Sequence, residues 1–311
     1  MSYSLTFGAD LEGSIRRVAR EQLEGAAARL RDGHAGDPVE AVHDARKHLK
    51  KTRSLLRLAR PAMPSSEFRR VNRALRDRGR ALSGTRDADV MVATVDALAE
   101  RFAGHLPASA FEHVRRPLAE RAAGQREDAA AAMAEHAEAL RALAAEADGW
   151  PLDGALAAAV AKARARSYAQ ARRAFRRAER EPTSANLHEW RKRAKDLWYH
   201  ERLLRASWPG VMRAQAKETR ELTQLLGENH DLAVLAQSLR DEPALTRSPA
   251  ADVDAILQLV EHRRAELLAA ARALAERIFA EPRKAHARRV GRYVELADGE
   301  AYAEPAAAPG I

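Results

Sequence analysis

The sequence contains no cysteine, which excludes disulfides, thiol nucleophiles and thiolate metal sites. Aromatic residues make up only 5% of the 311 residues, whereas alanine and arginine are abundant. This composition favours helices over strands. No apolar run approaches the roughly 18 residues that a membrane span needs, and the N-terminus lacks the pattern of a secretory signal. We therefore expect an all-α protein of the cytoplasm with no membrane span.

Residues 42–60, V-H-D-A-R-K-H-L-K-K-T-R-S-L-L-R-L-A-R, have a marked pattern of charge. At about 100° per helical residue, the basic residues fall within one arc of roughly a third of a turn. Asp44 is the only acid there, so these cations repel one another unless an anion binds. We call this arc the first basic face: His43, Arg46, Lys47, Lys50, Arg53 and Arg57. The opposite, apolar side consists of Val42, Ala45, Leu49, Thr52, Leu56 and Ala59.

The same pattern recurs about 145 residues later, in L-H-E-W-R-K-R-A-K-D-L-W-Y-H-E-R-L-L at 187–204. An acid again follows the histidine, because Glu189 takes the place of Asp44. The matching residues form the second basic face, with Tyr199 on the same side: His188, Arg191, Lys192, Lys195 and Arg202. Trp190, Ala194 and Leu197 occupy its apolar side.

The third helix of each half carries a further basic column, at an offset of about 144 residues. These columns are Arg69, Arg73, Arg76 and Arg80, matched by Arg213, Lys217 and Arg220. L-G-E-N-H-D-L-A-V-L at 226–235 matches L-S-G-T-R-D-A-D-V-M at 82–91, which places His230 opposite Arg86. The sequence therefore predicts an internal duplication that forms two similar helical bundles related by a pseudo-twofold axis.

Turn residues divide the chain into helices, and D-G-W-P at 148–151 is the boundary between the halves. Pro117 predicts a bend or break in the long fifth helix. The predicted helices are 10–32, 38–60, 65–82, 86–103 and 108–147, then 153–181, 183–207, 209–226, 230–240 and 251–280, with a short basic helix from 283.

The sequence offers little for catalysis. His43 and Asp44 are adjacent, so on a helix their side chains diverge by about 100° and cannot form a dyad. No phosphate-binding loop or nucleophile motif occurs. Asp87, Asp89 and Asp231 lie near predicted helix starts, where a carboxylate is more typical of a cap than of a metal ligand. We expect a non-catalytic protein without cofactor or metal, and a Mg²⁺-dependent phosphohydrolase is the lesser alternative.

A net charge of +9 suits a polyanionic partner. Nucleic acid is one alternative, but Trp198 and Tyr199 are the only aromatics beside the basic faces, and base reading needs more. The other is a phosphate chain held in one groove between the two basic faces, by arginine forks and lysine charges. His43 and His188 would gain protons beside it, so binding should strengthen below neutral pH.

The paired H-x-x-R-K-x-x-K segments, K-D-L-W-Y at 195–199 and L-G-E-N-H-D at 226–231 resemble the CHAD family, the conserved-histidine α-helical domain. The resemblance covers roughly 5–295 as one domain with halves 5–147 and 152–295, leaving 296–311 as a disordered tail. It implies two four-helix bundles around a basic central cavity that binds inorganic polyphosphate, association with polyphosphate granules, and no enzymatic activity.

By position, the family histidine falls on His43 and His188, and the family's basic residues include Lys51. The second copy departs from the pattern at Trp198, which stands where the first has Arg53. The predicted polyphosphate contacts are therefore His43, Arg46, Lys47, Lys50, Lys51, Arg53, Arg57, Arg69, Arg73, Arg76, Arg80, Arg86, His188, Arg191, Lys192, Lys195, Tyr199, Arg202, Arg213, Lys217, Arg220 and His230.

Overall fold

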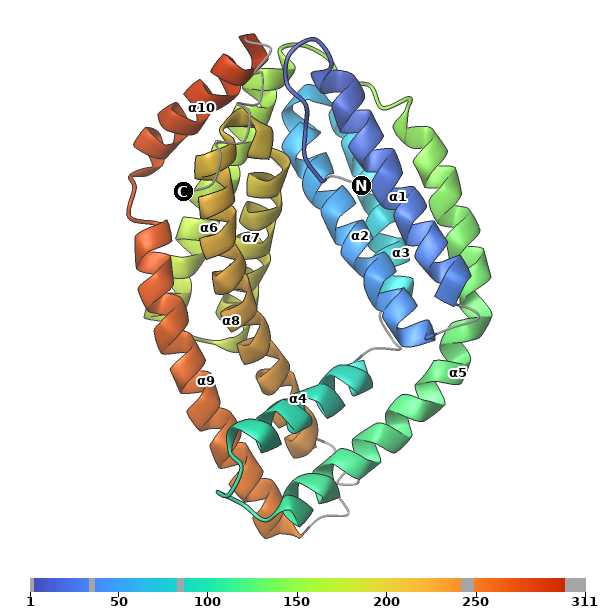
Figure 1. Cartoon of the computed structure of the whole chain (residues 1–311), viewed down its shortest axis with the longest axis vertical. Helices are drawn as coiled ribbons and strands as arrows, with labels where there is room; N and C mark the ends of the chain where they lie inside the picture. Colours follow the sequence, from blue (N-terminus) through green and yellow to red (C-terminus); the bar gives the residue numbers. More distant parts are fainter. Residues whose placement is uncertain (1–2, 34–36, 83–86, 242–248, 300–311) are drawn as a thin grey trace, which may run out of the picture.

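The computed structural model describes residues 3–33, 37–82, 87–241 and 249–299, without the side chains of 87–88 and 125–132. Within these ranges the regular elements are all helices, as the composition predicts (Figure 1). No helix among them is long and apolar enough to cross a membrane. The helices are α1 (Leu11–Gly33), α2 (Pro38–Ala59), η1 (Arg60–Ala62), α3 (Ser65–Ala81), α4 (Asp87–Arg101), α5 (Ala108–Ala147), α6 (Leu156–Arg180), α7 (Ser184–Leu203), η2 (Arg205–Ser207), α8 (Pro209–Asp241), α9 (Ala250–Ile278) and α10 (Arg283–Gly299).

The two helices with the basic faces begin at side-chain caps. The Asp37 carboxylate accepts hydrogen bonds from the backbone N–H groups of Val39 and Glu40, at 2.9 and 3.3 Å, and Pro38 occupies the first helical position. The Thr183 hydroxyl accepts one from Asn186 N–H at 3.3 Å. Such caps satisfy N–H groups that have no partner within the helix, so they fix where α2 and α7 start.

The predicted break in α8 is wrong, and of the bend or break predicted at Pro117 the break is absent. The stretches 209–226 and 230–240 form one helix, α8, and α5 continues through Pro117. A glycine inside a helix costs only about 1 kcal/mol relative to alanine, and buried Leu226 and Leu232 pack on either side of Gly227. Around Pro117, Val114 and Leu118 are fully buried. Packing therefore keeps both helices continuous despite the local propensity.

In the described part of the chain three hydrophobic cores hold the helices together, and they do not follow the predicted halves. The first joins α1, α2, α3 and the end of α5 to the start of α6 and the end of α7. The second lies among α6, α7, α8 and the end of α9. The third packs α4 and the start of α5 against the end of α8 and the start of α9. This third core, at the bottom of Figure 1, is shared between the halves.

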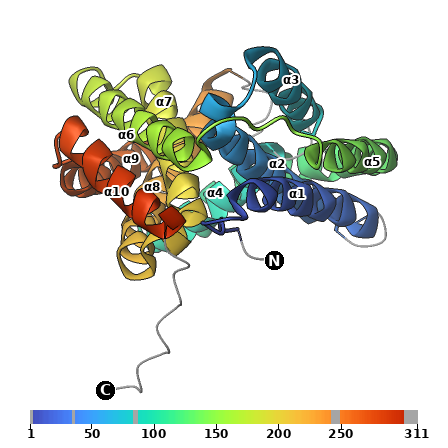
Figure 2. The same ribbon diagram turned by 90° about the horizontal axis from the view of Figure 1, so that it is seen from above.

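Seen from above, helices α6–α10 gather beside α1, α2, α3 and α5 (Figure 2). The counterparts differ, because the first half has α3 and α4 where the second has the single α8. The pseudo-twofold relation stays a prediction. At the C-terminus α10 is helical through Gly299, so the prediction of disorder is wrong for residues 296–299. The rest of the predicted tail, 300–311, lies outside the described residues.

Candidate functional site

The apolar side of α2 is buried as its helical period predicts. Val42 and Leu49 are each 2% exposed, and Leu56 is fully buried. The first basic face lies on the other side of the helix, with Lys47 and Lys50 exposed. The remaining predicted contacts on α2 are half-buried: His43, Arg46, Lys51, Arg53 and Arg57.

The second basic face is separated from the core in the same way. Trp190, Ala194 and Leu197 are at most 1% exposed, so the apolar side of α7 is confirmed. On the basic side, His188 and Lys192 are exposed, whereas Arg191, Lys195 and Arg202 are half-buried.

Tyr199 corrects the predicted set. This residue is only 3% exposed and packs edge-to-face against Tyr3, with ring centroids 5.9 Å apart. Burial raises the pKa of its hydroxyl to about 12. The N-terminal segment covers the edge of α7 here, so Tyr199 belongs to the core beneath the face. Lys195 still lies above it, with its Nζ 5.8 Å from the ring centroid.

The two basic faces approach each other. Burial lowers the pKa of Lys195 to about 8, and the charges that add to this effect include Arg220 of α8 and Lys47 of α2. Arg202 of α7 likewise helps burial to lower the pKa of Lys51. Cations lower a neighbour's pKa only across short distances, so these groups share one region. We call them the cationic cluster: Lys47, Lys50, Lys51, Arg57, Arg191, Lys195, Arg202, Arg220 and His230.

His230 joins this region from α8. Its ring centroid lies 5.0 Å from that of His188. Burial, and after it the charges of Arg191, His188 and Lys50, lower the pKa of His230 to about 4. Lys50 belongs to α2, so His230 lies between the two basic faces. The segment between residues 226 and 230, which the sequence predicted to be a turn, is part of the helix α8.

Acids compensate part of the charge, more than the sequence indicates. In both α2 and α7 the acid that follows the histidine forms an ion pair with a lysine one helical turn further along. Asp44 pairs with Lys47 at 2.8 Å, and Glu189 pairs with Lys192 at 2.9 Å. Arg57 forms an ion pair with Asp196, which links α2 directly to α7. The expectation that acids leave the positive charges almost uncompensated is therefore wrong for Lys47, Arg57 and Lys192.

The basic column of α3 reaches the first basic face, at Arg53, only through its C-terminal part. Arg53 donates to the Asn72 side chain at 3.2 Å, and Arg76 and Arg80 are among the charges that, after burial, lower the pKa of Arg53. Arg69 and Arg73 are exposed and make no hydrogen bond or ion pair with the cluster among the described residues. Arg86 lies outside the described residues.

The basic column of α8 lines a groove of about 520 Å³ beside the end of α7. Trp198 forms part of its wall, with Lys195 Nζ 4.5 Å and Arg202 Cζ 5.1 Å from the ring centroid. The residue that departs from the family pattern is thus an aromatic support for two cations. The basic residues in the groove wall are Arg202, Arg205, Arg213, Lys217 and Arg220.

Sequence reasoning missed Tyr3. Its hydroxyl donates to the Lys51 carbonyl at 2.8 Å, and its ring is 5.7 Å from Lys51 Nζ and 5.3 Å from Arg202 Cζ. One buried ring therefore contacts a cation of α2 and a cation of α7. Two residues on, Leu5 N–H donates to the Leu203 carbonyl at 2.8 Å. No periodic pattern in the first ten residues signals this role.

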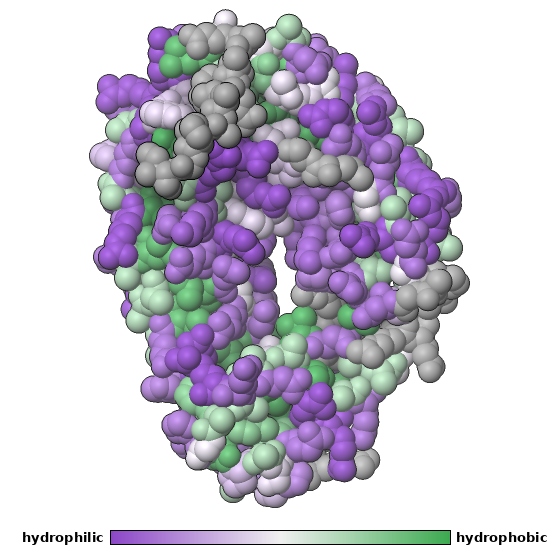
Figure 3. All heavy atoms as spheres, viewed as in Figure 1, coloured by the Kyte–Doolittle hydropathy of each residue, from purple (hydrophilic) through white to green (hydrophobic). Residues whose placement is uncertain are grey.

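Figure 3 shows an opening near the middle of the molecule, with hydrophilic residues along most of its border. In the same view, α2 lies on one side of it and α7 and α8 on the other (Figure 1). Among the described residues no group of three or more His, Asp or Glu could hold a metal ion.

A family model and solved structures match this chain. The family model described as the CHAD domain matches residues 15–240. A crystal structure of the CHAD domain from the plant Ricinus communis is similar over 94% of both chains, at 20% sequence identity and a TM-score of 0.56. At this identity the likeness supports the fold alone. No curated protein matches the sequence. The family model covers most of the chain, which therefore belongs to the CHAD domain family.

Proposed function

We propose that this protein binds inorganic polyphosphate, without turnover or cofactor, at the opening between α2 and α7. The observation that carries the proposal is the cationic cluster, which gathers charges from three helices with few acids among them. Such a cluster costs free energy in the empty protein, because like charges repel and burial disfavours each of them. A chain of phosphates offsets both effects at once.

The side chains suit this ligand. Arginine guanidinium groups bind phosphate oxygens bidentately, and lysines supply point charges that need no fixed direction. A regular chain with one charge on each unit matches a row of cations spaced along two helices. Such contacts read no base, so length rather than sequence decides affinity. A protein of this kind would be held at polyphosphate granules in the cytoplasm.

The test combines Lys50→Glu with Lys195→Glu. We expect this variant to lose retention of long-chain polyphosphate by at least about 100-fold, because two attractions become repulsions. Lys284→Glu with Arg288→Glu is the matched control, since it changes the net charge equally at exposed positions of α10. Binding is measured by filter retention at fixed salt, with circular dichroism to check helicity.

Equal loss in the control would show that net charge alone holds the polymer. Competition distinguishes the alternatives. RNA or DNA that displaces polyphosphate at equal phosphate concentration would make this a nucleic-acid-binding protein. Phosphate release on addition of Mg²⁺ would make it a phosphohydrolase.

A further inference from the structure

A second pocket, of about 470 Å³, lies between α8 and α10 and is closed below by α6 and α7. It meets the basic groove only at Glu201, which lines both. Its character is different from that of the groove. Three carboxylates face it, from Glu201, Glu218 and Glu281, so a phosphate chain would be repelled there.

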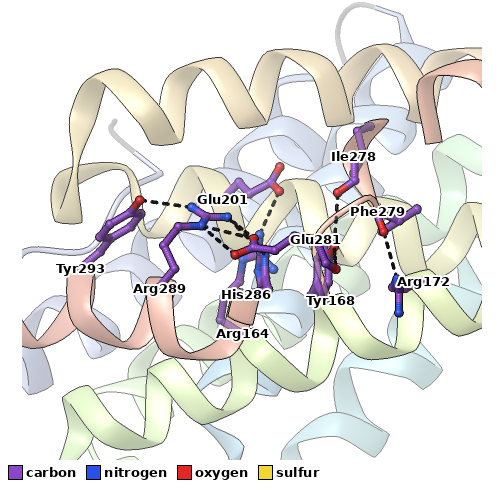
Figure 4. Close-up of polar contacts among 10 residues, drawn as sticks. All are labelled: Arg164, Tyr168, Arg172, Glu201, Ile278, Phe279, Glu281, His286, Arg289 and Tyr293. Carbon is purple, nitrogen blue, oxygen red and sulfur yellow. Dashed lines mark hydrogen bonds and ion pairs between the residues drawn. The ribbon is translucent and has the colours of Figure 1, made fainter. Parts of the chain in front are cut away.

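The floor of this pocket is a buried polar network (Figure 4). Glu201 accepts a hydrogen bond from Arg164 at 2.9 Å, and the two side chains are 3% and 1% exposed. Glu281 accepts from Arg289 at 2.7 Å and contacts His286 Nδ1 at 3.1 Å. Arg164 and Arg289 are thus each paired with a carboxylate, although Arg164 Nε and Nη1 have no hydrogen-bond partner among the described residues.

Among the described residues, three hydrogen-bond acceptors at this pocket have no partner, and Thr219 is a further contact of the Glu201 carboxylate. The three acceptors are Glu201 Oε2, Gln215 Oε1 and His286 Nε2, all buried, and all three residues line the pocket. His286 Nδ1 contacts Glu281 Oε2 at 3.1 Å and Arg289 Nη2 at 3.4 Å. The nearer carboxylate can only accept, so it favours the proton on Nδ1 and a lone pair on Nε2. Burial and the nearby Arg164 and Arg289 hold the pKa of His286 at about 2, so the ring stays neutral.

Buried acceptors without partners cost free energy, so a ligand with matching donors is stabilised there. An ammonium group carries three N–H donors and no acceptor, which fits three acceptors of which one is a carboxylate oxygen. The wall beside them is apolar, formed by Leu274 and Ile278 with Ala214 near the mouth. Arg277 and Glu218 are exposed and balance each other in charge.

We propose that this pocket binds a primary alkylammonium ion, with its –NH₃⁺ on the three acceptors and its chain against the apolar wall. The proposal does not rest on polyphosphate binding. It concerns an organic cation of about four carbons or a longer polyamine that presents such an end.

The test is calorimetric titration of the whole protein with n-butylammonium chloride. We expect saturable binding, at least about 10-fold tighter than that of 1-butanol. Butanol has the same four-carbon chain but carries no charge and only one hydrogen-bond donor. Butyrate should not bind. The ¹⁵N resonance of His286 Nε2 should shift on saturation, because its lone pair gains a donor.

Two variants test whether the ligand binds in this pocket. Gln215→Leu removes one acceptor and should weaken binding about 10-fold. Ala214→Phe fills the pocket and should abolish it. Ala216→Phe is the control on the same helix, because Ala216 lines the basic groove instead. Should Ala214→Phe fail to fold, Gln215→Leu decides the matter.

Absence of saturable heat would overturn the proposal, and so would equal affinity for butanol or unchanged binding in Gln215→Leu. A crystal soaked in butylammonium that shows only water on the three acceptors would do the same. Ala214→Phe should keep its affinity for polyphosphate, so failure here and failure of the proposed function give different results.

Discussion

Lys195 shows at the scale of one residue what it costs to gather cations. Its pKa of about 8 results mainly from burial, and then from Arg191, Arg202, Arg220 and Lys47. An ammonium with this pKa is charged at neutral pH and loses its proton just above it. A bound polyanion favours the charged form and returns the pKa towards its usual value.

The affinity for polyphosphate should therefore fall as pH rises from 7 to 9. Below pH 8 Lys195 is already charged, whereas above it binding requires proton uptake, which costs up to about 10-fold at pH 9. Lys195→Arg keeps its charge throughout and should flatten the profile. Titrations at constant ionic strength measure this, and parallel profiles for both proteins would contradict it.

Tyr3 is a second residue whose effect can be measured. Tyr3→Leu removes both cation–π contacts and the hydrogen bond that the Tyr3 hydroxyl donates to the Lys51 carbonyl. We expect a loss of about 1–3 kcal/mol in the free energy of unfolding by urea. Tyr3→Phe keeps the ring and should lose less. Equal losses in the two variants would assign the whole effect to the hydrogen bond.

At the scale of elements, the side of each helix that is buried could be predicted and the continuity of α8 could not. The faces of α2 and α7 follow from a period of 3.6 residues, which is local information. Whether L-G-E-N-H-D turns or continues depends on what packs against it. Leu226 and Leu232 belong to different cores, and the helix between them joins those cores.

Gly227→Ala tests that continuity. Gly227 has no positive φ, and a Cβ added there would meet only Arg191 Nε, at 4.0 Å. We expect the substitution to raise the free energy of unfolding by about 0.5–1 kcal/mol. Gly104→Ala is the contrasting variant, since its φ of 83° is strained for alanine and it should destabilise. Destabilisation by Gly227→Ala would indicate a turn.

At the scale of the whole molecule, the sequence predicted two bundles and missed the core they share. The duplication suggests halves that each close on themselves. The third core instead brings Phe111 and Val114 of α5 against Leu235 and Ile256, from the other half. Contacts between segments more than a hundred residues apart leave no periodic signal, so the sequence alone could not reveal them.

Fragments 1–149 and 150–311 should therefore fail to fold cooperatively when separate. Each would expose its part of the shared core, including Val95 and Leu98 in the first fragment and Leu232 in the second. Mixing them should restore a single thermal transition and a one-to-one complex by size-exclusion chromatography. Two independent sharp melts would instead support self-contained bundles.

The unbroken α8 has a mechanical consequence. Its 33 residues carry Arg213 and Lys217 near one end, His230 further along and Leu235 near the other. A continuous helix has no turn between its two ends, so a tilt of its first turns also moves its last turns. A phosphate chain bound in the groove should thus slow amide hydrogen exchange around Leu235, at the opposite end of α8 and far from any phosphate.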